Sequence, residues 1–370
     1  MKHFLRTGLA GFLCLITTQL SPAQSIDNVM LSSMKETPTE GAFSMEGYWV
    51  WGASVIRDDE GTYHMYAARW PGHLTFHPGW MIASDIVHAV SNSPVGPYKF
   101  VDVALPARGA QYWDGRSTFN PKICRYKDTY VLTYTGSTHP FPDFPEDDSL
   151  TLNSKYSIIG RSNKRIGIAY SKSPDGPWTR LDQSVLPTKP NTFYSFLTSN
   201  PAPWINEDGS VVLIFKSRSY NRHFPYHSSM KIGVATAPSF MGPYRVVSNE
   251  PIFGEGKMAE VEDPTIWKDQ EGYHMLAKDQ LGKITGSVGH GILAHSDDAV
   301  QWELDAKPYA YTKTIRWDDG TETTMGQLER VGVLLDEHDK VTHLIFATMD
   351  GPGGFNHSTR SWNIVVPLKR

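Results

Sequence analysis

The sequence predicts an all-β protein that folds as one five-bladed β-propeller in a single domain. The first observation is a unit that recurs about five times along the chain. Each unit has a short apolar strand, a tight turn with acidic residues or glycine, and a second strand rich in β-branched and aromatic residues. The unit is clearest at residues 259–281, AEVEDPTIWKDQEGYHMLAKDQL. Further copies begin near Gly52, Asn120, Asn200 and Glu329.

A second repeat lies between these units, and each copy is a strand and a turn that end in an aromatic residue. The copies read HAVSNSPVGPY at 88–98, GIAYSKSPDGPW at 167–178, GVATAPSFMGPY at 233–244 and, in degenerate form, GILAHSDDAVQW at 291–302. Two hairpins per unit make a four-stranded blade. Blades arranged radially bury their faces on one another and leave only short strand edges exposed.

Length and charge limit the classes of protein that this chain can be. Its 370 residues are enough for one large propeller with a sizeable core. The net charge of −4 gives no basic field for nucleic acid. The charge therefore argues against a nucleic-acid partner, and we expect a monomer without a membrane partner.

The amino terminus has the pattern of a secretory signal peptide. Lys2 and Arg6 precede an apolar run at 9–16. The stretch Ser21-Pro22-Ala23, with small residues at the expected cleavage site, follows this run. The run is shorter than the roughly 20 residues that span a bilayer. We predict a signal peptide at 1–23, a loose polar lead-in at 24–43 and the propeller at 44–370, exported to the periplasm or secreted. The mature chain keeps Cys124 alone and forms no internal disulfide. The final strand, 362–368, is expected to pair with the first unit and close the ring.

Several strand-opening motifs resemble the five-bladed propeller glycosidases related to glycoside hydrolase family 43. They are Phe119-Asn120-Pro121, Ser199-Asn200-Pro201, Glu262-Asp263-Pro264 and the turns of Ser-Pro-x-Gly-Pro-Trp type. The resemblance covers most of the mature chain. It implies a central pocket in which three carboxylates act as base, pKa-modulating group and acid.

This chain departs from that pattern at two of the three carboxylate positions. Glu262 stands at the acid position, but Gly52 and Asn200 replace the other two carboxylates. Hydrolysis of a glycoside normally needs two carboxyl groups. Asp263, Asp114 or Glu329 could supply the second one, and their spacing selects none of them.

Cationic and amide side chains recur near the strand ends instead. Lys216 and Lys278 fall at the same blade position, and Arg69 lies near another strand end. If such groups converge on the axis, they form a site for a uronate-bearing or sulfated saccharide. The other interpretation is that they are surface cations, each paired with a local acid. The expected substrate-binding residues are Trp51, Arg116, Asn120, Asn200, Lys216, Arg218, Lys278 and Arg330.

An acidic sugar suggests elimination, in a lyase or dehydratase that leaves an unsaturated uronyl residue. Cations would neutralise the uronate, and Glu262 would protonate the leaving oxygen. The alternatives are a glycoside hydrolase with displaced carboxylates and a non-catalytic sugar-binding propeller. A lone Glu262 among cations favours elimination, whereas a second pocket carboxyl about 5–10 Å away favours hydrolysis. The candidate bases are His139, Tyr194, Tyr220 and His290.

Histidines and long loops complete the expectations. His64, His274 and His343 follow the turn at equivalent positions of three units, which is typical of structural residues. His290 does not follow this pattern. It is a site residue, an ordinary turn residue, or a support for the central ion that the resemblance implies. No His and carboxylate spacing indicates a catalytic zinc, so no metal and no cofactor is required. The loop 71–80 is expected to cover one face. The loop 137–157 has a length typical of functional or disordered loops. The stretch 216–227 is basic and aromatic.

Overall fold

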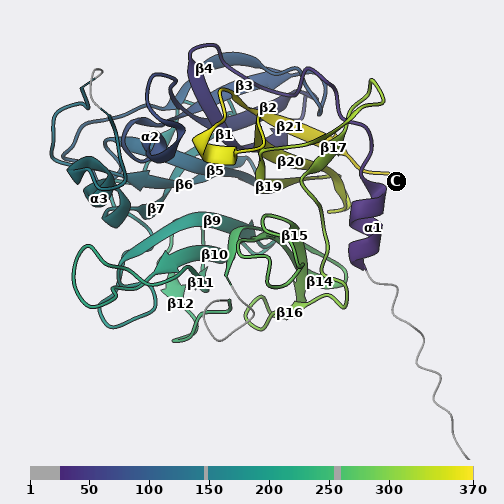
Figure 1. Ribbon diagram of the computed structural model, residues 1–370. Helices are drawn as coiled ribbons and strands as arrows, with labels where there is room; N and C mark the ends of the chain where they lie inside the picture. Colours follow the sequence, from purple (N-terminus) through teal and green to yellow (C-terminus); the bar gives the residue numbers. More distant parts are fainter. Residues whose placement is uncertain (1–25, 146–148, 254–259, 370) are drawn as a thin grey trace, which may run out of the picture.

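The structure, a computed structural model, describes residues 26–145, 149–253 and 260–369. The predicted signal peptide at 1–23 lies outside these residues. Figure 1 shows five antiparallel sheets arranged around a central axis, which confirms the predicted five-bladed propeller. No helix of the described residues is long and apolar enough to cross a bilayer.

Four of the blades have the expected two hairpins. In each blade the strands follow one another outward from the axis. Blade one is β1 (Tyr48–Arg57), β2 (Tyr63–Pro71), β3 (Asp85–Ser91) and β4 (Lys99–Leu105). Blade two is β5 (Ser117–Tyr126), β6 (Thr129–Ser137), β7 (Arg165–Ser171) and β8 (Thr179–Arg180). Blade three is β9 (Leu197–Ile205), β10 (Val211–Arg218), β11 (Lys231–Ala237) and β12 (Arg245–Val246). Blade four is β13 (Val261–Asp269), β14 (Gly272–Asp279), β15 (Gly291–Ser296) and β16 (Glu303–Leu304).

Blade five has three strands, and short elements decorate the ring. Its strands are β19 (Gln327–Leu335), β20 (Val341–Met349) and β21 (Ser361–Pro367), with the turn η1 (Gly354–Asn356) before the last. A small hairpin, β17 (Thr314–Arg316) and β18 (Glu322–Thr324), comes between blades four and five. The helices are α1 (Ile26–Ser33), α2 (Phe76–Ala83) and α3 (Lys155–Ser162), of which α2 and α3 contact each other.

Ring closure differs from the sequence prediction. Strand β21 pairs with β20 inside blade five, not with a strand of the first unit. The segment before blade one supplies the outer partner instead, through bridges from Met34 to Leu368 and from Phe43 to Asn363. Figure 1 accordingly shows α1 beside the carboxyl terminus. The described part of the lead-in is therefore packed rather than loose, because Met30 and Met34 are buried in the core of blade five.

One conformational feature repeats in the innermost strand of every blade. A single residue there has a left-handed backbone, and the pairing register slips around it. Glycine, asparagine and aspartate adopt this conformation most readily. Such bulges bend the strand and redirect side chains, and they bring the preceding residues Trp51, Phe119, Glu262 and Glu329 to one pocket. The left-handed residues are Gly52 (φ 66°), Asn120 (54°), Asn200 (48°), Asp263 (57°) and Arg330 (57°).

Candidate active site

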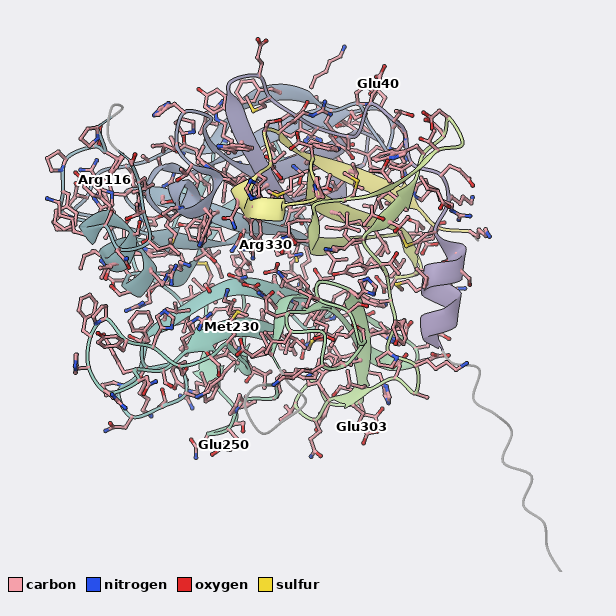
Figure 2. All side chains as sticks on the ribbon, viewed as in Figure 1. Glu40, Arg116, Met230, Glu250, Glu303 and Arg330 are labelled. Atoms are coloured by element: carbon pink, nitrogen blue, oxygen red, sulfur yellow. The ribbon has the colours of Figure 1, made fainter. Side chains whose placement is uncertain are left out.

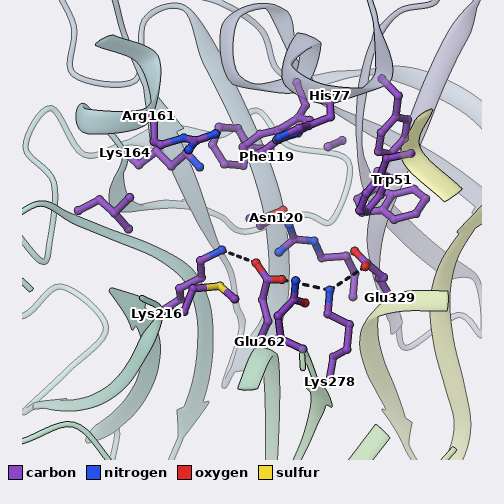
Figure 3. Close-up of a pocket in the computed structure, with 18 of the residues that line it drawn as sticks. Trp51, His77, Phe119, Asn120, Arg161, Lys164, Lys216, Glu262, Lys278 and Glu329 are labelled. Carbon is purple, nitrogen blue, oxygen red and sulfur yellow. Dashed lines mark hydrogen bonds and ion pairs between the residues drawn. The ribbon is translucent and has the colours of Figure 1, made fainter. Parts of the chain in front are cut away.

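A pocket of about 330 Å³ opens at the end of the axis where the innermost strands begin (Figure 3). One side of it is aromatic, formed by Trp51 and Trp70 of blade one, Phe76 and Trp80 of α2, and Phe119 of β5. The rest of the lining is mostly charged. We call Lys216, Glu262, Lys278 and Glu329 the ionic floor, and Arg161, Lys164 and Arg218 the cationic wall.

The ionic floor is a chain of alternating charges. Lys216 bonds Glu262, and the Nζ atom of Lys278 lies 3.1 Å from Oε2 of Glu262 and 2.6 Å from Oε1 of Glu329. Since both carboxylates contact one ammonium, their nearest oxygens are no farther apart than these two distances together. Glu262 therefore has a carboxylate neighbour, Glu329. It is one of the three residues that the sequence offered as the second carboxyl group.

The two carboxyl groups differ in their protonation. Burial raises the pKa of Glu262, but the ammonium groups of Lys216 and Lys278 outweigh burial and hold this pKa well below its usual range. Burial also raises the pKa of Glu329, and there Lys278 does not offset it. Burial acts to lower the pKa of Lys278, but the attraction of Glu329 and Glu262 exceeds this cost, so that the pKa of Lys278 is raised. The floor thus holds one firmly ionised carboxylate next to one that retains its proton more easily.

Polar side chains of blades two to five form an incomplete hydrogen-bonded ring around the axis, to which blade one contributes no side chain because it has Gly52 there. The Nδ2 atom of Asn120 donates to Oδ1 of Asn200 over 3.0 Å, and Nδ2 of Asn200 donates to Oδ1 of Asp263 over 2.7 Å. Arg330 bonds the same Asp263 oxygen. Below this ring, Nζ of Lys122 donates to Oγ1 of Thr265 over 2.5 Å.

These axial residues do not fit the central ion that the family resemblance implies. Arg330 and Lys122 bring positive charge to the axis, and Asp263 is the carboxylate that bonds there. A divalent cation would be repelled by both basic groups. His290 lies in the loop between β14 and β15 and does not line the axial cavity.

The cationic wall is not neutralised by ion pairs within the part of the chain that the structure describes. None of Arg161, Lys164 and Arg218 has a carboxylate within ion-pair distance among the described residues. Nζ of Lys164 lies 4.2 Å from the Trp80 ring centre, a cation–π distance. Burial, assisted by nearby Lys216 and Arg161, lowers the pKa of Lys164 well below its usual range. An anion from a ligand would compensate this wall.

His77 of α2 faces the same pocket from the side opposite the floor (Figure 3). Its Nδ1 accepts a hydrogen bond from Nε1 of Trp80 over 3.0 Å. Burial, with Arg161 adding to it, lowers the pKa of His77 to about 4. The neutral ring therefore carries its proton on Nε2, where it can donate to a bound molecule.

The pocket brings together most of the residues that the sequence assigned to substrate binding. Arg116 is not among them, because it pairs with Asp143 over 2.6 Å at the periphery (Figure 2). Asn200 belongs to the axial ring instead. The predicted residues that line the pocket are Trp51, Asn120, Lys216, Arg218, Glu262, Lys278 and Arg330.

The structure brings none of the proposed bases into the pocket lining. His139 is buried against Tyr156, with ring centres 5.1 Å apart. Tyr194 packs on aromatic residues of blade three, and Tyr220 is exposed on the loop after β10. Asp114, one of the proposed replacement acids, is fully buried and bonds Arg108. Arg69 is stacked 4.4 Å from the Tyr48 ring centre, also outside the pocket.

Sequence reasoning missed several lining residues because they do not belong to the repeat. Arg161 lies in α3, and Lys164 follows this helix. His77 and Trp80 lie in α2. Both helices are insertions between strands, so no equivalent position in another blade draws attention to them. The signals were the loop 71–80, which was expected to cover one face, and the length of the loop 137–157. Both contribute to the pocket, the second through Leu152.

Comparison with known proteins places this architecture among glycoside hydrolases. A family 117 glycoside hydrolase, Zg3597 of the marine bacterium Zobellia galactanivorans, superposes with a TM-score of 0.63 at 20% identity, over 93% of this chain and 91% of that one. The fold is that of the five-bladed glycoside hydrolases. CoXyl43, a family 43 β-xylosidase/α-arabinofuranosidase from a compost metagenome, gives a TM-score of 0.55 at 14% identity, over 91% and 96% of the two chains.

A third solved structure, an endo-arabinase from Bacteroides thetaiotaomicron, matches with a TM-score of 0.51 at 12% identity, over 91% of this chain and 98% of that one. No protein-family model matches the sequence, and no curated protein matches it. The shared architecture was predicted from the strand-opening motifs and is confirmed. At these identities it concerns the fold alone, so chemistry has to be argued from the pocket.

Proposed function

We propose that this chain is an exported carbohydrate-active enzyme that hydrolyses a glycosidic bond in an anionic oligosaccharide. The observation that carries the proposal is the pair Glu262 and Glu329. They share the ammonium of Lys278, and their surroundings move their pKa values in opposite directions. In such a pair, the carboxyl group with the lowered pKa is the ionised group, here Glu262. The one with the raised pKa is the proton donor, here Glu329.

The separation of the two carboxylates favours a retaining mechanism. Retaining enzymes hold the pair about 5–5.5 Å apart, and inverting enzymes hold it about 6.5–9.5 Å apart to admit a water molecule. The contacts of 3.1 and 2.6 Å with Lys278 keep the nearest oxygens no farther apart than the sum of the two, which is below the inverting range. A second carboxyl this close to Glu262 supports hydrolysis over elimination, the distinction that the sequence analysis drew.

The proposed steps use the two groups in turn. Glu329 gives its proton to the glycosidic oxygen while an oxygen of Glu262 attacks the anomeric carbon and the bond to the leaving group breaks. Glu329, now ionised, then takes a proton from a water molecule that attacks the same carbon and releases Glu262. The net reaction adds one water molecule across the cleaved bond. Glycoside hydrolase activity of the neighbours in fold supports this choice.

The cationic wall supports an anionic substrate. Arg161, Lys164 and Arg218 lack carboxylate partners among the described residues, and a uronate or sulfate ester would supply one. The aromatic side, with Trp51 and Trp80, offers flat apolar surface to the sugar ring. An exported enzyme of this type would act on fragments of acidic polysaccharides.

Elimination is the second candidate, and Lys164 is the observation that favours it. Its lowered pKa makes the unprotonated amine easier to reach than for an ordinary lysine, beside the guanidinium groups of Arg161 and Arg218. That amine could take the C5 proton of a uronate while Glu329 protonates the leaving oxygen at C4, which leaves a C4–C5 double bond. The assignment of Glu262 as the acid, made from the sequence, fits less well, since its lysine partners hold it ionised.

One assay separates these possibilities. The purified chain is incubated with uronate-containing and sulfated oligosaccharides while ultraviolet absorbance, product mass and the anomeric proton signals are followed. Hydrolysis adds one water at a cleaved bond with retained configuration and no absorbance. Elimination gives an absorbing product without added water, and it requires Lys164, so Lys164→Met would abolish it. A binding-only protein gives no product. Inversion of configuration would contradict the retaining assignment of Glu262.

A further inference from the structure

Two buried histidines of blade one lie far from the pocket, with their rings close together. Nδ1 of His64, on β2, is 2.9 Å from Nε2 of His88, on β3. Both side chains are almost fully buried. A carboxylate oxygen of Asp175, from the turn between β7 and β8 of blade two, lies 3.9 Å from the same His64 nitrogen. The three ligand atoms lie within 4.8 Å of one another.

The outward-facing nitrogens of the two rings also face carboxylates. Nε2 of His64 is 3.1 Å from Oδ2 of Asp58, and Nδ1 of His88 is 3.8 Å from Oδ1 of Asp102. This is the arrangement found around metal-bound histidines. A carboxylate outside the site holds the far ring proton, so that the near nitrogen keeps its lone pair for the metal.

When both rings are neutral, the protein groups alone leave one ring nitrogen without a hydrogen-bond partner. If Nε2 of His64 donates to Asp58, then Nδ1 of His64 must accept its proton from Nε2 of His88. The neutral His88 ring then has a bare lone pair on Nδ1, which is buried without a hydrogen-bond partner and faces the carboxylate of Asp102. Two acceptors that face each other in this way are unfavourable.

A cation between the rings resolves this conflict. With a metal bound to Nδ1 of His64 and Nε2 of His88, each ring carries its proton on the far nitrogen. The His64 proton is donated to Asp58, and the His88 proton points toward Asp102. No ring nitrogen then directs a lone pair at a carboxylate, although the 3.8 Å between His88 and Asp102 has to shorten to become a hydrogen bond.

We propose that His64, His88 and Asp175 form a zinc site that links blade one to blade two. Two imidazoles and one carboxylate are a ligand set that zinc accepts, with a further position left for solvent beside the exposed Asp175. The link is reinforced nearby, because the hydroxyl of Tyr66 donates to the carbonyl of Pro174. The site lies at the turn end of β1, away from the pocket, so its role is structural.

No sequence pattern indicates this site, because its ligands come from two strands of one blade and a turn of the next. The repeat also argues against a metal ligand at His64, because His274 of blade four is its equivalent and repeated residues are typically structural. There the histidine bonds Asp269 over 2.9 Å. His295, opposite on the neighbouring strand, is half exposed and bonds Asp305 instead. His274 is therefore a matched control for His64.

The test measures zinc in the tag-free full chain by elemental analysis, with affinity obtained by competition against a chelator. The wild type is expected to bind about one zinc per chain, and zinc is expected to raise its Tm. His64→Gln should abolish both effects, while His274→Gln should keep both. Asp58→Asn should weaken zinc binding about 10–100-fold, as expected for a partner of a ligating histidine.

Asp175→Asn keeps the test decisive if His64→Gln fails to fold. Asp175 is exposed and its loss costs little packing, so this variant should fold like the wild type and yet bind zinc more weakly. The proposal is overturned if the wild type takes up no zinc. It is also overturned if Asp175→Asn, Asp58→Asn and His274→Gln all bind zinc as the wild type does, since the metal would then be bound elsewhere.

Discussion

On the floor of the pocket both ammonium groups contact carboxylates, whereas no carboxylate of residues 26–145, 149–253 and 260–369 lies within ion-pair distance of the wall. Lys278 lies 3.1 Å from Glu262 and 2.6 Å from Glu329, and its pKa is raised by them. Lys164, on the wall of the same pocket, has a ring face for a neighbour and a lowered pKa. The pKa of the same residue type is thus shifted in opposite directions. The difference teaches that the floor is charge-paired without ligand, and it supports the proposal that a bound anion pairs with the wall.

The largest expected effect comes from the carboxylates of the floor. Glu262→Gln and Glu329→Gln should each lower kcat by about 10²–10⁴-fold. The first removes the proposed nucleophile, and the second removes the proposed proton donor. Steady-state kinetics on the best anionic oligosaccharide measures this. Glu303→Gln, at an exposed carboxylate, is the control. Full activity in Glu329→Gln would leave Glu262 alone and remove the basis for hydrolysis.

Removing the central ammonium should damage the fold itself. Lys278→Met leaves two buried carboxylates next to each other without the cation between them, and breaking a buried ion pair costs about 3–5 kcal/mol. We expect the free energy of unfolding, measured with urea, to fall by that amount. Lys268→Met, which removes an ammonium stacked on Tyr273, is the control. Unchanged stability would mean that the floor is not the preformed charge network described above.

The wall should affect binding more than turnover. Arg161→Ala and Arg218→Ala remove charge-assisted hydrogen bonds worth about 1.5–3 kcal/mol each, so kcat/KM for an anionic substrate should fall by about one to two orders of magnitude. A neutral analogue of the same sugar should lose little. Arg116→Ala, which loses its peripheral partner Asp143, serves as the control. Equal losses for charged and neutral sugars would contradict an anion-binding wall.

The smallest effect concerns the pH dependence of stability. Because the pKa of Lys164 is lowered in the folded chain, the unfolded chain binds more protons between that lowered pKa and the usual value of about 10.4. Lys164 therefore makes stability rise with pH across this window. Lys164→Met should flatten the rise and be more stable than the wild type near neutral pH, in Tm measured at several pH values. Lys172→Met, at an exposed lysine paired with Asp128, should leave the slope unchanged.

The part of the molecule that the sequence predicts well is the part that repeats. Each blade carries the same period, so strands and the left-handed positions at Asn120, Asn200 and Asp263 could be aligned within one chain. Glu329 was among three candidate partners for Glu262, but spacing could not select it. Their association depends on Lys278 bridging the first strands of blades four and five, which is a tertiary contact.

The remaining features depend on segments without internal equivalents. Arg161 and Lys164 come from the insertion around α3, and nothing in their local sequence points to the axis. His139 and Arg116 looked like site residues because they stand beside strand ends, yet they are held by Tyr156 and Asp143. Closure of the ring was assigned to the wrong partner because the short bridges of Met34 and Phe43 carry no strand pattern.

The pairing of the first and last described segments also limits when the molecule can assemble. Met34 and Phe43 find their partners in Leu368 and Asn363, which are the last part of the chain to be synthesised. Blades one to four can form in order as the chain grows. The amino-terminal segment, however, must wait through the synthesis of more than three hundred residues before its strand partner exists. Until that moment the ring stays open, and a chain that ends early leaves the edge of blade five without its cover.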